Sequence, residues 1–132
     1  MLRNGRPTSY GTYTGFCTLV TGYLIKLMHI LYLTNHLNTG GITQYLLSLS
    51  AGLKKRGHDI YLASAGGELE GEFLRCGITC FKMPLRTKCE FAPGVFASFF
   101  KLLPLVRKYK IDIIHCNTRV TQVTGCLLSK YS

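Results

Sequence analysis

One stretch decides the fold: residues 26–47, KLMHILYLTNHLNTGGITQYLL. Its apolar run, Ile30 to Leu33, lacks the polar alternation of a half-exposed strand and predicts a strand covered on both faces. A helical pattern follows directly after Gly40 and Gly41. Because these two residues have no Cβ, a ligand can approach the first free N–H groups of that helix closely. We therefore predict a binding site at this turn.

Working outward, the same alternation of strand and helix continues to the end of the chain. It predicts strands at 58–64, 78–83 and 111–116, and helices at 42–56, at 68–76, from Pro93 onward, and from the Asn117-Thr118 cap toward Lys130. The expected buried faces of the two longest helices are Ile42, Tyr45, Leu46, Leu49 and Leu53 in the first, and Val95, Phe96, Phe99, Leu102, Leu103 and Val106 in the third.

This order predicts an α/β fold, a Rossmann-like open parallel sheet of about four strands with helices on both faces. The expected strand order is 3-2-1-4, so the winding reverses between the first and fourth strands, and ligands bind beyond the carboxyl ends of the strands at that reversal. The fourth strand would lie at an edge. The residues expected in this crevice are Asn35, His36, Gly40, Gly41, His115, Asn117, Thr118 and Arg119.

Composition bounds the class of protein. The chain has 132 residues, 47% hydrophobic and 17% charged, which suits one small globular domain. Its formal charge of +10 favours partners that carry phosphates, namely nucleic acid, anionic lipid or sugar phosphates. A nucleic-acid partner is disfavoured because no recognition helix or aromatic-basic strand motif is present.

Residues 1–27 are expected to be a poorly ordered extension or a mis-called translation start, with the domain proper at 28–132. The apolar run from Phe16 to Ile25 is not followed by a signal-peptide cleavage site, and Lys26 interrupts it. Charge near its centre argues against a membrane span.

No cofactor or metal is expected. The glycine turn lacks the three spaced glycines of a dinucleotide fold, and the second strand ends in Ala63-Ser64 rather than in an acidic residue. None of the six cysteines forms the closely spaced pair of a zinc or redox motif. We interpret all six as reduced, structural thiols, which favours a cytoplasmic protein.

Three segments carry a resemblance: Gly40 to Leu47, Leu53 to Ile60, and Ile111 to His115. Together they resemble the N-terminal domain of family 4 (group 1) glycosyltransferases, which has a double-glycine loop, a basic-Gly-His-acidic junction and an Asp-apolar-apolar-His strand end. The likeness covers residues 28–132.

The resemblance implies a retaining enzyme with two facing Rossmann-like domains, which transfers a hexosyl unit from a nucleotide-sugar to a glycan or lipid-linked acceptor. It implies that Gly40 and Gly41 lie against the donor diphosphate and that His115 is the catalytic candidate. Asn117 stands where the family often has a second histidine, so it can bind a hydroxyl but cannot carry a proton. Acceptor-side candidates are Asn35, His36, Asn117, Thr118 and Arg119, with acceptor choice depending on the loops 37–39 and 86–92.

The family's donor-binding domain and its pair of carboxylates have no counterpart in this sequence. We therefore expect the polypeptide alone to be inactive, as a truncated reading frame or gene fragment would be. The resemblance further implies polysaccharide or cell-envelope biosynthesis, and peripheral contact with anionic lipid at the inner face of the plasma membrane through Lys101, Arg107, Lys108 and Lys110. The alternative is a stand-alone flavodoxin-like domain that binds a small phosphate ligand or is regulatory.

Overall fold

The computed structural model describes residues 17–20, 23–86 and 88–132. Its main body is a sheet of four parallel strands in the order β5-β4-β3-β6, which confirms the predicted order 3-2-1-4. In chain order the elements are β1 (Cys17–Val20), β2 (Tyr23–Lys26), β3 (His29–Leu33), α1 (Gly41–Lys55), β4 (Asp59–Ser64), α2 (Glu70–Arg75), β5 (Thr79–Lys82), α3 (Pro93–Lys108), β6 (Ile113–Cys116) and α4 (Arg119–Tyr131).

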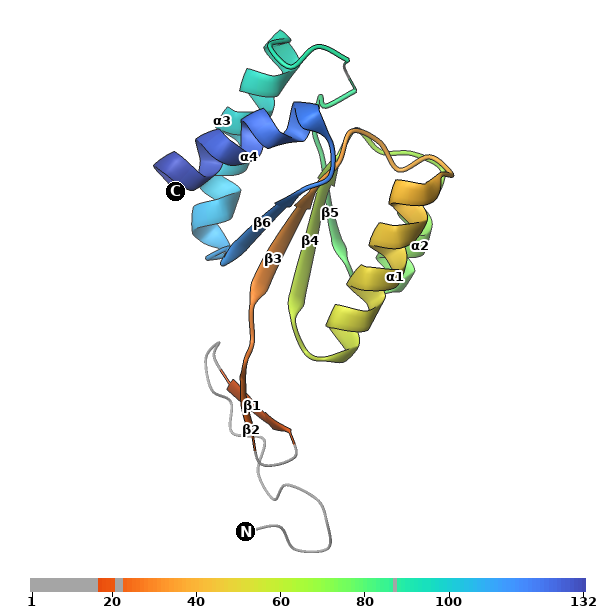
Figure 1. The fold of residues 1–132 in the computed structure, drawn as a ribbon, viewed down its shortest axis with the longest axis vertical. Helices are drawn as coiled ribbons and strands as arrows, with labels where there is room; N and C mark the ends of the chain where they lie inside the picture. Colours follow the sequence, from red (N-terminus) through yellow and green to blue (C-terminus); the bar gives the residue numbers. More distant parts are fainter. Residues whose placement is uncertain (1–16, 21–22, 87) are drawn as a thin grey trace, which may run out of the picture.

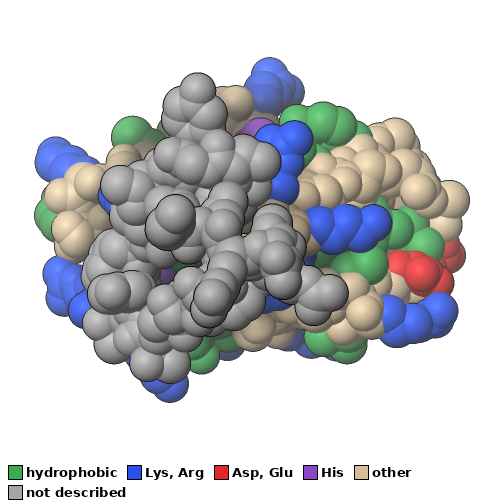
Figure 2. All heavy atoms as spheres, turned by 90° about the horizontal axis from the view of Figure 1, so that it is seen from below, with side chains coloured by type: hydrophobic (Ala, Val, Ile, Leu, Met, Phe, Trp, Pro, Cys, Tyr) green, Lys and Arg blue, Asp and Glu red, His purple; other side chains and the backbone are tan. Residues whose placement is uncertain are grey.

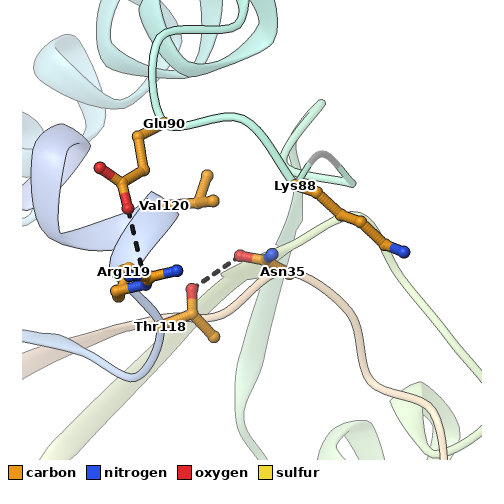
Figure 3. A pocket seen from close by; sticks show the side chains of 6 residues that line it. All are labelled: Asn35, Lys88, Glu90, Thr118, Arg119 and Val120. Carbon is orange, nitrogen blue, oxygen red and sulfur yellow. Dashed lines mark hydrogen bonds and ion pairs between the residues drawn. The ribbon is translucent and has the colours of Figure 1, made fainter.

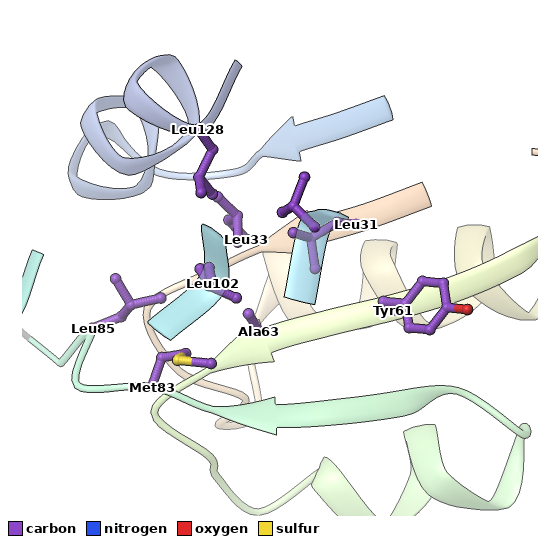
Figure 4. Packing of buried hydrophobic residues seen from close by; sticks show 9 residues of the cluster. Leu31, Leu33, Tyr61, Ala63, Met83, Leu85, Leu102 and Leu128 are labelled. Carbon is purple, nitrogen blue, oxygen red and sulfur yellow. The ribbon is translucent and has the colours of Figure 1, made fainter. Parts of the chain in front are cut away.

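Helices cover both faces of this sheet, α1 and α2 on one and α3 and α4 on the other (Figure 1). Side chains of β3 alternate between the two layers, as the pleat of a strand requires. Leu31 and Leu33 pack toward α3 and α4 (Figure 4), whereas Ile30 and Tyr32 pack toward α1 and α2. This double coverage explains why the run from Ile30 to Leu33 is continuously apolar.

The predicted apolar faces of the long helices are partly wrong. Ile42 and Tyr45 are 50% and 54% exposed, and Phe96 on α3 is 43% exposed. The buried residues of α1 are Thr43, Leu46 and Ser50. Because α1 packs over β4 and against α2, the part of its apolar stripe that faces away from them is left uncovered.

Strand β6 pairs only with β3 among the described strands and lies at an edge of the sheet, as predicted. The side chain of Ile113 is 41% exposed on it. An apolar side chain on an unpaired parallel edge is unusual, because parallel sheets are normally covered on both faces.

The chain before β3 contains the antiparallel pair β1–β2, in which Cys17 lies opposite Lys26. The Lys26 ammonium lies 3.6 Å from the carboxylate of Asp112. The prediction that residues 1–27 are a poorly ordered extension falls mostly on residues outside the described ones and stays a prediction.

Cys80 and Cys116 lie in β5 and β6 as predicted, half-buried and without a disulfide. Burial raises the pKa of the Cys80 thiol to about 11, with a smaller contribution from Glu70, and burial also raises the pKa of Cys116. Cys89 and Cys126 are exposed, so an interior packing role does not extend to them.

Two further features concern the surface. In the view from the end at which the strands begin, the visible Lys and Arg side chains are spread around the face and acidic side chains are few (Figure 2). Within the described part of the chain, no helix has both the length and the apolar character needed to cross a membrane.

Candidate functional site

The predicted crevice lies where β3 and β6 end side by side, with Leu33 paired to Cys116. The chain leaving β6 is held to β3 at once, since the backbone N–H of Asn117 donates to the carbonyl of Leu33 at 3.0 Å. The side-chain amide of Asn117 donates to the same carbonyl at 3.2 Å. Asn117 therefore fixes the crevice floor.

Thr118 links the two loops that leave these strands. Its hydroxyl donates to the side-chain oxygen of Asn35 at 2.7 Å (Figure 3). Thr118 is also the N-cap of α4, where it forms a reciprocal capping box with Thr121. One side chain thus starts a helix and bridges the winding reversal.

The glycine turn starts α1 with Gly40 as N-cap and Gly41 as the first helical residue. No side chain caps this helix, and its first turn contains no acidic residue. A Cβ added at Gly41 would meet nothing within 4 Å, and one added at Gly40 would meet only the carbonyl oxygen of Asn38, at 3.9 Å. Gly40 is extended, with a φ of 173°, and Gly41 does not lie in the left-handed region either, so the backbone does not require glycine at either position. The space beside this helix start is open to a ligand.

The loop that leads to the glycine turn is held by the segment after β4. Backbone bonds run from Thr34 N to Ala63 O, from Leu37 N to Gly66 O and from Leu69 N to Leu37 O, at 2.9–3.1 Å. Gly67 is needed here for close approach, because a Cβ would collide with the backbone of Leu37.

Glu68 completes this connection. Its carboxylate accepts a hydrogen bond from the hydroxyl of Thr39 at 2.9 Å and a longer one from the backbone N–H of Thr39 at 3.4 Å. Thr39 immediately precedes the glycine pair, so Glu68 holds the turn from the outside. Sequence reasoning missed this contact, because nothing in either loop predicts a bond between residues 29 positions apart.

Two adjoining cavities open at the crevice. The larger, about 360 Å³, lies among Asn35, Lys88, Glu90, Thr118, Arg119 and Val120 (Figure 3), and the smaller, about 260 Å³, lies among Asn35, His36, Arg86 and Lys88. Of the residues predicted for the crevice, the structure therefore brings Asn35, His36, Thr118 and Arg119 together around these cavities. Arg86, Lys88 and Glu90 were not predicted individually, because the irregular loop 86–92 has no periodicity that could place them.

Four predicted residues line neither cavity: Gly40, Gly41, His115 and Asn117, the last of which is bonded to the carbonyl of Leu33. Gly40 and Gly41 start α1 and do not line either cavity. The ring of His115 lies against that of Tyr32, with centroids 5.1 Å apart, in the layer that packs toward α1. The functional roles of all these residues stay predictions. Among the described residues, no three His, Cys, Asp or Glu side chains are grouped as a metal site would need.

Comparison with known proteins gives the family. The model of Glycosyltransferase Family 4 matches residues 39–131, which is most of the chain and includes the glycine turn. The chain belongs to this family. This match confirms the resemblance to family 4 glycosyltransferases that was predicted from the three motifs.

A solved structure agrees with this assignment at the level of the fold. The crystal structure of a glycosyltransferase from Rickettsia africae ESF-5 is 21% identical in sequence, with a TM-score of 0.66 over 80% of this chain. The present chain spans only 27% of the length of that protein. No curated protein is significantly similar in sequence.

Proposed function

We propose that this chain is the N-terminal, acceptor-side portion of a retaining glycosyltransferase that transfers a hexosyl unit from a nucleotide-sugar to a glycan or lipid-linked acceptor. The observation that carries the proposal is the family match over residues 39–131 together with the open glycine turn inside it. The proposed setting is polysaccharide or cell-envelope biosynthesis in the cytoplasm.

In this proposal the glycine turn receives the donor diphosphate. The N–H groups of the first turn of an α-helix lack intrahelical partners, and the helix dipole favours an anion there. In α1 no side chain competes for these groups. Among the residues that line the two described cavities, Glu90 is the single acidic side chain, and it lies beside Arg119.

The roles of the two histidines follow from their positions. His36 lines the smaller cavity and is proposed to contact the acceptor. His115 touches Tyr32 on the layer facing α1, the side on which the glycine turn starts, and is proposed to contact the sugar that is transferred.

The test is a sugar-transfer assay with a panel of nucleotide-sugars. We expect the 132-residue chain alone to transfer nothing, and an extended protein that joins it to a donor-binding domain to transfer sugar from one of the donors. Transfer by neither protein, with both folded, would contradict the proposal and leave a stand-alone phosphate-binding domain as the better description.

A matched pair of variants isolates the glycine turn. Gly41 and Gly52 both lie in α1 with nothing within 4 Å of an added Cβ, so alanine at either position should stabilise the helix by about 0.5–1 kcal/mol. In the extended enzyme, Gly41→Ala should lower kcat/KM for the donor about tenfold or more, because the methyl group occupies the space meant for phosphate. Gly52→Ala should leave it unchanged. Equal activities of the two variants would remove the glycine turn from the donor site.

Contact with an anionic membrane is part of the proposal. Phe96 and Phe100 are 43% and 70% exposed and lie one turn apart on α3, and Lys101 follows Phe100 in the sequence. Exposed aromatic groups beside cations are typical of surfaces that bind lipid headgroups. Flotation with vesicles should recover the protein only when anionic lipid is present, and Phe96→Ser with Phe100→Ser should abolish it. Recovery independent of lipid charge would argue against this contact.

A further inference from the structure

We infer that the two adjoining cavities form an oxyanion subsite, so that the acceptor of the proposed transfer carries a phosphate or carboxylate group held by Arg86 and Lys88. The identification of the bound ligand as the acceptor rests on the proposed function. The binding chemistry itself rests on the geometry and charge of the cavities.

The first argument is shape and place. The two cavities share Asn35 and Lys88, so they lie next to each other at the carboxyl ends of β3 and β6, and we call the pair the hollow. The larger cavity, about 360 Å³, is in the range of small-molecule sites, about 300–1,000 Å³, and the smaller, about 260 Å³, lies just below that range. Open α/β sheets bind ligands at this reversal of winding.

The second argument is charge. Three basic side chains line the hollow, those of Arg86, Lys88 and Arg119, and the lining contains one carboxylate, that of Glu90. Glu90 is engaged by Arg119, whose Nε lies 3.6 Å from it. Among the described residues, no carboxylate pairs with Arg86 or Lys88. The hollow therefore holds an excess of positive charge that an oxyanion would neutralise.

The third argument is that the floor of the hollow is fixed. The bond from Thr118 to Asn35 joins its two sides, and the capping box holds Thr118 in place (Figure 3). Val120, in the first turn of α4, lines the larger cavity, so the positive end of that helix dipole also faces it. An anion binding there meets side chains whose positions are already set, which keeps the entropy cost of binding low.

The hollow is separate from the glycine turn, which is the proposed site of the donor diphosphate. Neither Gly40 nor Gly41 lines it, and α1 begins on the opposite layer of the sheet from α4. A two-substrate enzyme needs two anion sites when both substrates are charged. The glycine turn and this hollow would supply one each.

The test uses the 132-residue chain and backbone amide NMR. Sodium phosphate, added against sodium chloride at matched ionic strength, should shift the amides of Asn35, Lys88, Arg119 and Val120 with one saturating affinity. The double variant Arg86→Gln with Lys88→Gln should weaken that affinity about tenfold. Lys130→Gln removes a similar exposed charge, about 16 Å along α4 from Arg119, and should weaken the affinity for phosphate less than twofold.

Two arms identify the source of the oxyanion. Glycerol 3-phosphate represents a soluble phosphorylated acceptor, and vesicles of phosphatidic acid, compared with phosphatidylcholine, represent a lipid-linked one. The arm whose binding the double variant abolishes identifies the source. Equal losses in the double variant and in Lys130→Gln would show a solvated basic surface only and overturn the inference.

The outcome also separates the inference from the proposed function. A nucleoside diphosphate that shifts Ile42 and Thr43, while phosphate leaves Arg119 and Val120 unmoved, would overturn the inference and leave the donor assignment standing. If phosphate binds in the hollow but the extended protein transfers no sugar, the oxyanion subsite stands and the proposed function is overturned.

Discussion

Replacing Thr118 with alanine tests the architecture of the crevice most directly. The variant loses the N-cap of α4, worth about 1 kcal/mol in typical helices, and the 2.7 Å bond to Asn35, worth about another 1 kcal/mol. We therefore expect the free energy of unfolding to fall by about 2 kcal/mol. Thr118→Ser keeps the hydroxyl and should cost less than about 0.5 kcal/mol.

Urea denaturation followed by circular dichroism measures these differences. With a slope of about 2 kcal/mol per molar urea, the alanine variant should unfold at a concentration about 1 M lower than the parent chain. A double-mutant cycle with Asn35→Ala isolates the cross-loop bond, for which we expect a coupling energy of about 1 kcal/mol.

Two results would refute the reasoning. If Thr118→Ser is as destabilising as Thr118→Ala, the hydroxyl is not the stabilising group. If the cycle gives no coupling, Thr118 caps α4 but does not join the loops, and the hollow loses the fixed floor on which the oxyanion inference depends.

Three further predictions concern other parts of the chain. Glu68→Ala should speed hydrogen exchange at the Thr39 amide about fivefold or more, because it breaks both hydrogen bonds to that residue, and Glu68→Gln should have an intermediate effect. Unchanged exchange would show that Glu68 does not hold the glycine turn. Alanine normally stabilises a helix relative to glycine by about 0.5–1 kcal/mol. Gly125→Ala should nevertheless destabilise the protein, because the added methyl group would collide with the sulfur of Cys116 on β6. A stabilised variant would show that α4 can move aside. The folded state keeps the proton of the Cys80 thiol up to about pH 11, whereas the unfolded chain loses it near pH 9.0, so the free energy of unfolding should fall as pH rises from about 9 to about 11, and less steeply in Cys80→Ala. A thiol reagent at pH 8 should also modify the exposed Cys126 long before Cys80. Equal labelling rates of the two thiols would contradict the burial of Cys80.

The strand order followed from the sequence because local signals determine it. Alternating apolar strands and helices allow few parallel arrangements, and a continuous apolar run such as Ile30 to Leu33 must be central. The cap of α4 was predicted as Asn117 or Thr118 because capping is a local interaction, and the structure shows that it is Thr118. Gly57, which follows the C-cap of α1, has a φ of 91°, the left-handed conformation that glycine commonly adopts at a helix end.

What the sequence could not provide is long-range. Ile42 and Tyr45 fit the apolar stripe of α1, yet whether a stripe is covered depends on which elements lie above it. The positions of Arg86 and Lys88 depend on the path of an aperiodic loop, so they were flagged only as part of the range 86–92. The crevice was predicted from topology, whereas the charged half of its lining required coordinates.

The backbone bonds between the segments 34–37 and 63–69 extend the sheet's order beyond the ends of its strands. A segment tied in this way has little freedom left to lose when a substrate arrives, and little capacity to fold over it. In the proposed transfer, any closure over the reacting sugar would therefore have to come from segments other than these two. Gly66 and Gly67 line neither cavity, but a Cβ at Gly67 would collide with the backbone of Leu37, next to His36, so a substitution there should disturb the smaller cavity through this loop.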